Sequence, residues 1–348
     1  MKKRLWSRVT ALLVLGAAVA GMSGLAGCND GSSTAPGGTP GGSGASDEIK
    51  VTTLEKYAPR IYLAPDGLGG AQSYRPSSVE WFTPHVDRVL IEGQYWVQTK
   101  VTLSHATEVI NAFYGPLDSE LGQVPAYAFW VEDPARPRDY VDLVYFFFYP
   151  YNRGKEILGS VWGNHVGDWE HVTVRIDAET LAPRAVALSA HAGGESLTWA
   201  DLEKTPGGHP IAYSAWGSHA NYSRSGNHTY NTISVPPLAD INITDRTAAA
   251  GESVAWDTWN KIEAFDFYGR RGLGSVAWPN WMNTDFTNAG PDPSNPLAGA
   301  IYRWGNTEDT CGLCLGPQCW DFPDICLREN GPTGPISKST VWNVDLLD

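Results

Sequence analysis

The sequence lacks the short motifs that mark several common classes of enzyme. It contains no H-E-x-x-H helix, no G-x-S-x-G nucleophile elbow, no P-loop, and no G-x-G-x-x-G after an expected strand. It also lacks an internal repeat, and few segments place apolar residues at the 3.6-residue spacing of a helix. These absences argue against a zinc protease, a serine hydrolase of the elbow type and the usual nucleotide-binding folds.

Basic residues are scarce relative to acidic ones. The chain has 25 Lys and Arg against 38 Asp and Glu, which gives a formal net charge of −13 at pH 7. A protein of this charge repels the phosphate backbone of nucleic acids, so we expect no nucleic-acid partner. The balance favours cations or uncharged ligands.

Residues 1–27 have the pattern of an export signal. Basic residues precede an apolar run that is too short to span a membrane, and Leu25-Ala26-Gly27 then leads into Cys28. This ending resembles a bacterial lipobox, in which the cysteine is acylated and becomes the new N-terminus. We therefore expect lipidation of Cys28 and an exported protein of the cell envelope, lipid-anchored to a bacterial membrane. The alternative is an ordinary signal peptide followed by an unmodified cysteine.

Residues 28–47 contain almost no apolar side chain and are dominated by Gly, Ser, Thr and Pro, which predicts a disordered tether after the lipidated cysteine. Residues 48–348 are numerous enough for a single domain with a substantial core. The whole chain has 15 Trp, 15 Tyr and 10 Phe beside 37 Gly and 24 Pro. With short strand-like runs at Arg60–Leu63, Ala126–Val131 and Ile211–Trp216, this composition predicts an all-β fold, a β-sandwich with long loops.

The stretch from Val141 to Ile176 contains two apolar runs of strand character, separated by a Gly-rich loop. In the second run, period-two alternation puts Asp168 and Glu170 on the same face as the apolar residues that follow them. An ionised carboxylate on an apolar face is costly unless it is paired or bound to a cation. His165 lies close enough along the chain to reach the same point.

His165, Asp168 and Glu170 are therefore our candidate ligands for one divalent cation. Carboxylate oxygens with one imidazole suit a hard or intermediate ion, and we expect Mg²⁺ or Ca²⁺. The alternative is structural: the strand begins at the wet rim of the sheet, where both carboxylates meet only solvent or an arginine.

Two further histidines, His191 and His219, stand where a strand gives way to a loop of small residues. Because loops cluster at the two ends of a sandwich, such side chains can converge there. We expect them to bind coordinated water or to orient a ligand rather than to touch the ion. Aromatic side chains from the same regions are candidates for contact with a ligand: Trp162, Trp169 and Trp216.

Near the C-terminus, four cysteines lie close together at Cys311, Cys314, Cys319 and Cys326. In a cytosolic protein this spacing would suggest zinc held by four thiolates. In an exported one the thiols oxidise, and two disulfides with three alternative pairings follow. We expect disulfides that staple a loop-rich C-terminal segment.

Five patches in order along the chain resemble the vacuolar protein sorting-associated protein 62 family. They are Lys56–Leu63, Tyr74–Phe82, Gly167–Val172, Tyr213–Tyr222 and Gly331–Pro335. The resemblance extends from about residue 50 to the C-terminus. The biochemical activity of that family is not settled, so the resemblance implies a relationship rather than a reaction.

A more distant resemblance is to the necrosis- and ethylene-inducing-like cytolysins, carried in order by the run from Tyr149-Pro150 through Gly167–Val172, then Ser189–His191, His209-Pro210 and Ser218–Ala220. Members of that family are β-sandwiches with a G-H-R-H-D-W-E motif, and they use a divalent cation to engage sphingolipid headgroups. The resemblance places the first His of the motif on His165, its Asp on Asp168 and its Glu on Glu170.

The same resemblance has two departures. The second His of the motif falls on Gly167, and an upstream Asp ligand of that family falls near Asn152, which offers only a neutral amide. A site with fewer charges binds a cation more weakly, so the resemblance implies a cytolysin-like fold and cation pocket without the cytolytic activity. Asn152 joins the second tier of pocket residues.

Two functions remain open from the sequence. The first is a membrane-tethered binding module whose cation and aromatic side chains contact a glycan or a lipid headgroup. The second is a metal-dependent hydrolase of phosphoesters or glycosides that uses the same pocket, with His165 or His219 moving protons. Asp168 and Glu170 could also be the acid and base of a glycosidase, although two residues on one strand face lie at the low end of the required separation.

Overall fold

The computed structural model describes residues 43–65, 74–100, 113–157, 159–233, 240–279, 281–282, 302–311, 313–315, 318–320, 326–338 and 341. The described residues all belong to one compact unit, Pro40–Asp348. The predicted signal, Cys28 and most of the predicted tether therefore lie outside the described residues. No helix in the described part is long and apolar enough to cross a membrane.

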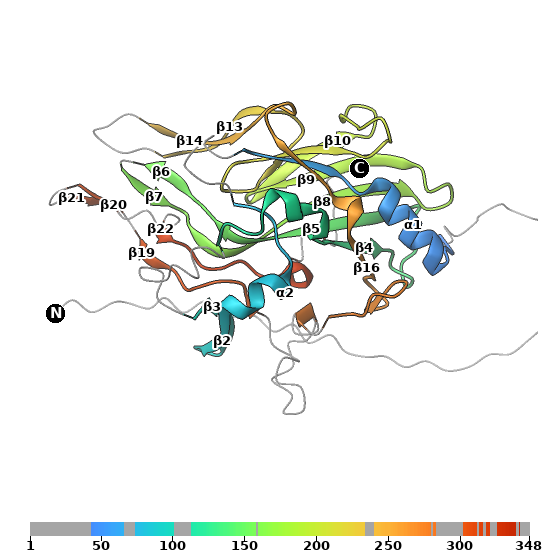
Figure 1. Ribbon diagram of the computed structural model, residues 1–348, viewed down its shortest axis with the longest axis horizontal. Helices are drawn as coiled ribbons and strands as arrows, with labels where there is room; N and C mark the ends of the chain where they lie inside the picture. The colour runs from blue at the N-terminus through green and yellow to red at the C-terminus, as the bar shows by residue number, and fades with distance from the viewer. Residues whose placement is uncertain are drawn as a thin grey trace, which may run out of the picture. The chain divides into compact units, whose positions relative to one another are not determined.

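The larger sheet has seven strands in the order β10-β9-β8-β5-β4-β16-β17, and all neighbours are antiparallel except β4 and β16. Its strands are β4 (Ala126–Val131), β5 (Tyr140–Asn152), β8 (His165–Asp177), β9 (Pro183–Ala190), β10 (Gly193–Thr198), β16 (Ile262–Asp266) and β17 (Arg271–Gly272). The two strands predicted around the Gly-rich loop are β5 and β8, and they pair with each other at the centre of this sheet (Figure 1).

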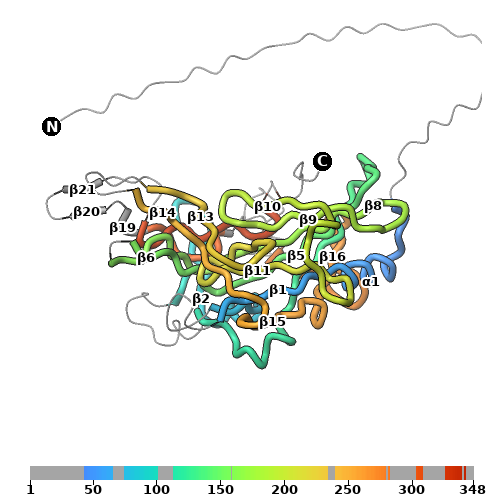
Figure 2. Tube along the Cα trace, turned by 90° about the horizontal axis from the view of Figure 1, so that it is seen from above, coloured from blue at the N-terminus to red at the C-terminus, as the bar shows by residue number. Residues whose placement is uncertain are grey.

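The smaller sheet has four strands in the order β12-β11-β1-β15. Its strands are β1 (Arg60–Leu63), β11 (Ile211–Ser214), β12 (Asn221–Tyr222) and β15 (Val254–Asp257). Side chains from β1, β11 and β15 form one buried cluster with those from one face of β4, β5, β8 and β9. Figure 2 shows β1, β11 and β15 running beside the strands of the larger sheet.

The opposite face of the seven-stranded sheet is buried as well. A second cluster joins Phe146 and Phe148 of β5 to Trp169, Trp304 and residues of helix α2 (Val79–Phe82). Burial of both faces explains why β5 is an almost continuous apolar run rather than an alternating one. The strand β8 alternates between the clusters: Val172, Val174 and Ile176 lie in the first, and Trp169 in the second.

Two further two-stranded units lie next to the ends of β5 and β8 that carry the candidate site. They are the hairpin β6 (Lys155–Ile157) with β7 (Ser160–Trp162), and the ribbon β13 (Gly226–Ile233) with β14 (Ile241–Thr247). They pack against each other through a small apolar cluster of Ile157, Trp162, Ile233 and Ile243. Figure 1 shows the ribbon above the hairpin at one end of the molecule.

The remaining strands form small sheets. These are β2 (Val86–Ile91) and β3 (Gln94–Thr99) with β18 (Tyr302–Arg303), β19 (Asp309–Cys311) with β22 (Cys326–Arg328), and β20 (Leu313–Leu315) with β21 (Gln318–Trp320). Helix α1 (Asp47–Tyr57) begins at the last residue of the predicted tether, where the Ser46 hydroxyl accepts a hydrogen bond from Ile49 N at 3.4 Å. Its first turn carries Asp47 and Glu48, which suit the positive end of the helix dipole.

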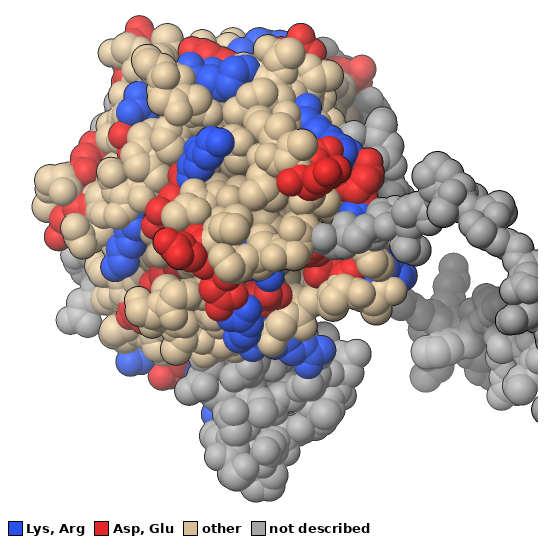
Figure 3. Space-filling view, turned by 90° about the vertical axis from the view of Figure 1, so that its right-hand side faces the viewer, with Lys and Arg blue, Asp and Glu red and all other residues tan. Residues whose placement is uncertain are grey.

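The expectation of a β-rich chain is confirmed, because strands make up most of the regular structure and helices contribute little. On the face shown in Figure 3, acidic and basic side chains are interspersed rather than gathered into one field. Recognition on this face would therefore depend on individual pockets rather than on a broad patch of one charge.

Candidate functional site

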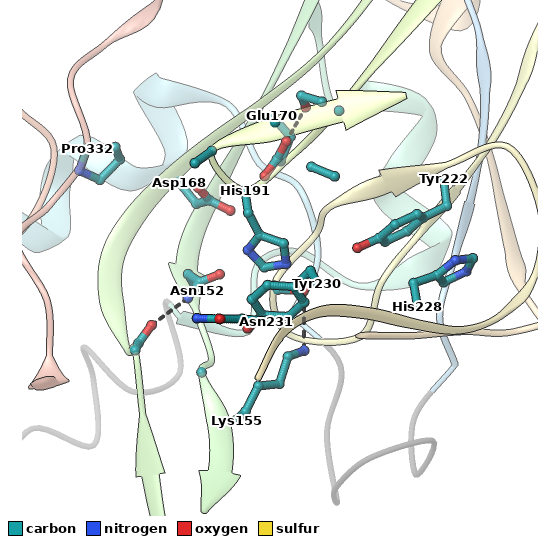
Figure 4. A pocket seen from close by; sticks show the side chains of 18 of the residues that line it. Asn152, Lys155, Asp168, Glu170, His191, Tyr222, His228, Tyr230, Asn231 and Pro332 are labelled. Carbon is teal, nitrogen blue, oxygen red and sulfur yellow. Dashed lines mark hydrogen bonds between the residues drawn. The ribbon is translucent and has the colours of Figure 1, made fainter. Parts of the chain in front are cut away.

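His165, Asp168, Glu170, Asn152 and His191 line a cavity of about 980 Å³ at one end of β5 and β8, whereas His219 is not among its lining residues. Its walls come from the start of β8, the loop between β9 and β10, strand β6 and residues 227–231 of β13. Figure 4 shows the carboxyl groups of Asp168 and Glu170 turned toward the space that His191 and Tyr230 border. The cavity thus collects side chains from segments that are far apart in the sequence.

Asp168 is only 6% exposed, so it does not lie at a wet rim of the sheet. Its Oδ1 accepts a hydrogen bond from Trp169 N at 2.9 Å, and its Oδ2 accepts one from His219 Nδ1 at 2.9 Å. Burial raises the pKa of Asp168, but the hydrogen bond from His219 and the nearby His165 lower it, and the pKa ends below the usual aspartate value. Asp168 is therefore an ionised carboxylate partnered by a histidine.

His219 lies in the short loop between β11 and β12 with a φ of +60°, which is rare for a residue with a side chain. Its ring stacks on Tyr149 with the centroids 3.8 Å apart, and burial lowers its pKa, so the ring is neutral at pH 7. Since Nδ1 donates to Asp168, Nε2 carries the lone pair. That buried nitrogen has no hydrogen-bond partner among the described residues.

Glu170 is 8% exposed, and its carboxyl group accepts a hydrogen bond from the Ser189 hydroxyl at the end of β9. The Ser189 oxygen itself accepts a hydrogen bond from His171 N at 2.8 Å. Burial, followed by the neighbouring Asp168 carboxylate, holds the pKa of Glu170 well above the usual glutamate value. Glu170 is thus held in a place where its negative charge is disfavoured.

His165, the third predicted ligand, also borders the cavity. Its Nδ1 lies 2.8 Å from the carbonyl oxygen of Gly167 and donates to it, so Nε2 keeps its lone pair in the neutral ring. Gly167 has a φ of +68°, and a Cβ at this position would lie 2.5 Å from the carbonyl oxygen of Trp304. Only glycine fits here, and the bend that it allows positions His165 before Asp168.

Asn152, from the end of β5, lies opposite His165 in the strand register and borders the cavity. Its Nδ2 donates to the carbonyl oxygen of Gly163 at 2.8 Å. This bond fixes the amide and leaves its Oδ1 as the group that a ligand or an ion could use.

The sequence did not reveal a second carboxylate centre, Asp245 on β14. This side chain is fully buried and receives four polar groups: Lys155 Nζ and Ser218 Oγ at 2.6 Å each on Oδ1, and His191 Nε2 at 2.6 Å and Tyr222 OH at 2.8 Å on Oδ2. Burial raises the pKa of Asp245, but His191 and Lys155 bring it well below the usual value.

The signal for Asp245 was available in the sequence. Alternation along β14 puts Asp245 on the face that carries Ile243 and Thr247, and all three are buried. An acidic residue on the inward face of a strand was the argument that identified Asp168 and Glu170. His191, which has a φ of +52°, is held in the cavity wall by this second centre.

The three predicted aromatic contacts are largely buried: Trp162 is 8% exposed, Trp169 1% and Trp216 7%. Trp162 and Trp169 border the cavity, whereas Trp216 borders a different pocket. More accessible rings around the cavity come from Tyr230, which is 40% exposed and stacks on His191, and from Tyr222, which stacks on His228.

Carboxylate oxygens, an amide oxygen and imidazole nitrogens border one cavity. These are the types of ligand atom that a hard or intermediate cation prefers. In the part of the chain that the structure describes, no three His, Cys, Asp or Glu side chains stand close enough together to hold an ion as they are. Asp168 and Glu170 instead bind His219 and Ser189. An ion would have to compete with these hydrogen bonds.

Comparison with known families matches residues 92–346 to the model of "Vacuolar protein sorting-associated protein 62". Among curated proteins of Saccharomyces cerevisiae, "Putative vacuolar protein sorting-associated protein TDA6" is 32% identical over 247 residues, which cover 58% of this chain and 51% of that protein. "Vacuolar protein sorting-associated protein 62" is 36% identical over 183 residues, which cover 45% of this chain and 38% of that protein. The chain thus spans about half the length of these relatives or less.

Solved structures similar to this chain include Necrosis and Ethylene inducing Protein 2 from the causal agent of cocoa's Witches Broom disease, with a TM-score of 0.26, 17% identity and coverage of 54% of this chain and 72% of that chain. Another is NLPPya in complex with glucosamine, with a TM-score of 0.31, 13% identity and coverage of 65% and 78%. The sequence resemblance to necrosis-inducing proteins is thus matched by similar solved structures. Because the TM-scores are low, nothing about the site is inferred from them.

The predicted location in a bacterial cell envelope is wrong. The curated relatives are vacuolar sorting proteins of a yeast rather than bacterial envelope lipoproteins. The lipobox-like ending misled because it consists of four small or apolar residues, a pattern that short apolar segments form easily. Modification of Cys28 itself stays a prediction.

Proposed function

This chain belongs to the vacuolar protein sorting-associated protein 62 family, and we propose that its cavity is a divalent-cation-dependent binding site for a glycan or a lipid headgroup. The observation that carries the proposal is the pair Asp168 and Glu170. Two carboxyl groups two positions apart on one strand face are both more than nine-tenths buried at the wall of one cavity. The names of the relatives describe sorting and give no chemistry for this site.

The energetics of the pair favour a cation. Burying a carboxylate costs several kcal/mol unless a charge or hydrogen bonds compensate it, and a second carboxylate nearby adds repulsion. The raised pKa of Glu170 expresses that cost, because burial and Asp168 both disfavour its ionised form. A divalent cation would offset both charges at once, which is how proteins retain clustered carboxylates.

We assign the ligand roles as follows. Asp168 and Glu170 would supply oxygens and His165 its Nε2, while Asn152, His191 and His219 would bind coordinated water or the ligand. A bound Mg²⁺ or Ca²⁺ would supply a positive charge that attracts hydroxyl or phosphate oxygens. The chain's own groups then select the ligand: Tyr230, Asn231 and His228 border the cavity along β13 and offer an aromatic face with polar donors and acceptors.

We further propose that the two large sheets form a β-sandwich, since the first buried cluster contains side chains of both. The proposal extends to two disulfides, Cys311 with Cys326 and Cys314 with Cys319. In the antiparallel pairs β19–β22 and β20–β21, these cysteines are direct cross-strand partners. Cross-strand neighbours have Cβ atoms about 4.5 to 5.5 Å apart, near the separation that a disulfide spans.

A metal-dependent hydrolase is the second candidate, and one observation favours it. His219 is fixed by Asp168 in the tautomer that leaves the Nε2 lone pair free, and no described residue occupies that nitrogen. A histidine oriented by a carboxylate is a common general base, so His219 could accept a proton from water.

The test is a paired screen of the purified chain. Glycan and phospholipid arrays are probed in Ca²⁺, in Mg²⁺ and in chelator, and phosphomonoester, phosphodiester and glycoside reporters are assayed under the same conditions. Binding that needs the ion and is lost in Asp168→Asn, without turnover, supports the binding module. Ion-dependent turnover that His219→Gln removes supports the hydrolase, and neither signal in any condition would contradict both.

A further inference from the structure

We propose that a second pocket, bordered by Arg153, Arg246 and Trp216, binds an oxyanion such as a phosphate or sulfate group. The pocket has a volume of about 310 Å³ and lies between hairpin β6–β7 and strand β14. Arg153, Arg246 and Trp216 do not border the first cavity, so this proposal does not rest on the function proposed above.

The backbone places the two arginines on either side of one segment. Arg153 N donates to the carbonyl oxygen of Gly217 at 2.9 Å, and Trp216 N donates to the carbonyl oxygen of Arg246 at 2.9 Å. Trp216 and Gly217 therefore run between Arg153 and Arg246. Gly217 has a φ of +80°, and a Cβ there would lie 2.9 Å from the carbonyl oxygen of Arg153, so glycine is required for this close approach.

The side chains build a cationic pocket on an aromatic base. The Arg153 guanidinium lies over the Trp216 ring, 4.6 Å from its centroid. Stacking of this kind holds a guanidinium by its face and leaves its N–H groups at the edge available for an acceptor. The one acceptor found for Arg153 within the described ranges is the carbonyl oxygen of Gly154, at 3.3 Å.

Neither arginine is neutralised by the described part of the protein. Arg153 and Arg246 form no ion pair with a carboxylate of those residues, whereas other guanidiniums, such as those of Arg60 and Arg271, do. Glu156 also borders the pocket, which leaves one positive charge in excess. In a chain with a net charge of −13, two guanidiniums that line one pocket without an ion-pair partner among the described residues favour an anionic ligand.

Lys155 borders both this pocket and the cation cavity, but it is already committed. Its Nζ lies 2.6 Å from Asp245 Oδ1 and 3.3 Å from Ser218 Oγ. Lys155 therefore separates the two sites, and because its charge is neutralised by Asp245 it adds little positive charge to either. The oxyanion would be held by the two arginines, with Asn242 and Thr244 of β14 also in the lining.

A tetrahedral oxyanion matches these donors, because a guanidinium presents paired N–H groups that bind phosphate or sulfate oxygens in parallel. The same chemistry is carried by free phosphate and by a phosphate monoester in a lipid headgroup. The pocket by itself would recognise the phosphate group that both ligands contain.

The experiment measures binding of inorganic phosphate, sodium sulfate, and vesicles of phosphatidylcholine with or without phosphatidate to the full chain. Chelator is present throughout, so that no cation bridges the probe to the first site. The variants are Arg153→Gln and Arg246→Gln, with Lys261→Gln as the control, since Lys261 is an exposed cation that does not border the pocket. Thermal melts confirm that each variant is folded; Arg246 is exposed, so its variant keeps the core intact.

We expect each arginine variant to weaken binding by about tenfold and Lys261→Gln to leave it unchanged. Binding of inorganic phosphate with that pattern identifies a site for the free anion. Binding restricted to phosphatidate vesicles, with the same pattern, supports the pocket and assigns a lipid source. No binding of any probe at millimolar concentration, or an equal loss in Lys261→Gln, would overturn the proposal. Asp168→Asn separates this test from that of the cation site, because it should leave phosphate binding in chelator unchanged.

Discussion

His219 Nδ1 and Asp168 Oδ2 lie 2.9 Å apart although 51 residues separate them in the chain. Asp168 belongs to β8 of the seven-stranded sheet, and His219 follows β11 of the four-stranded sheet. The bond therefore connects the two sheets at the wall of the cavity. Because Asp168 is ionised and His219 is neutral, Nδ1 of His219 donates to the carboxylate. Nε2 of His219 is then held in place with its lone pair available as a hydrogen-bond acceptor.

Glu170→Gln should raise the stability of the cation-free protein at pH 7 and weaken its cation binding. Burial and Asp168 raise the pKa of Glu170 in the folded state. Below the unfolded pKa of about 4.3 both states hold the proton, and stability then falls as the pH rises toward the folded pKa. Glutamine keeps the shape and has no charge to lose, so this decline should disappear.

The measurement is a series of thermal melts between pH 4 and pH 8 in chelator. Glu179→Gln is the matched control, since Glu179 is exposed at the turn that follows β8. Equal pH dependence in wild type and Glu170→Gln would show that Glu170 titrates like an exposed glutamate.

Asp245→Asn should cost about 3 kcal/mol of unfolding free energy at pH 7, because it removes the charge that Lys155 and His191 face in a buried site. The pKa of Asp245 is depressed in the folded protein, so its contribution is present above the unfolded pKa of about 3.9 and is lost as the pH falls through the folded value. Urea unfolding at pH 7 and at pH 3 checks this. The difference in unfolding free energy between wild type and Asp245→Asn should shrink at the lower pH. A difference that stays constant with pH would contradict this prediction, as would an equal difference in the exposed variant Asp201→Asn.

Peptide mapping without reduction should recover Cys311 linked to Cys326 and Cys314 linked to Cys319. The strand register puts these residues directly opposite each other. Closing such short loops typically stabilises a fold by about 2 to 4 kcal/mol each. Either of the other two pairings, or zinc released on thiol modification, would show that the register does not determine the bonding.

The sequence was sufficient for the central strands and for one half of the site. Period-two alternation in β8 separates Asp168 and Glu170 from Trp169, and the structure places them on the face that continues into Val172. The predicted strands β1 and β4 have the expected bounds, and β11 ends two residues before the predicted Trp216. These features depend on neighbours along the chain, which a single sequence reveals.

The other half of the site depends on distant packing. Ser189, His219 and Asp245 contact the cavity residues Glu170, Asp168 and His191 because β9, the loop after β11, and β14 converge there. Nothing in their local sequence states which strands will be neighbours. Helix α1 was missed for a different reason: its apolar residues lack a clear periodic face, although Ser46 and the acidic first turn were signals of a helix start.

Titration calorimetry of Ca²⁺ and Mg²⁺ into chelator-treated protein tests the central claim most directly. Wild type should bind one ion, Asp168→Asn and Glu170→Gln should each weaken the binding by at least tenfold, and the exposed Asp201→Asn and Glu179→Gln should not change it. Thermal melts of the same samples should show that the ion stabilises the wild type but neither Asp168→Asn nor Glu170→Gln. No binding heat at millimolar metal, together with identical melts with and without the ion, would contradict the cation site and leave Asp168 as a structural partner of His219.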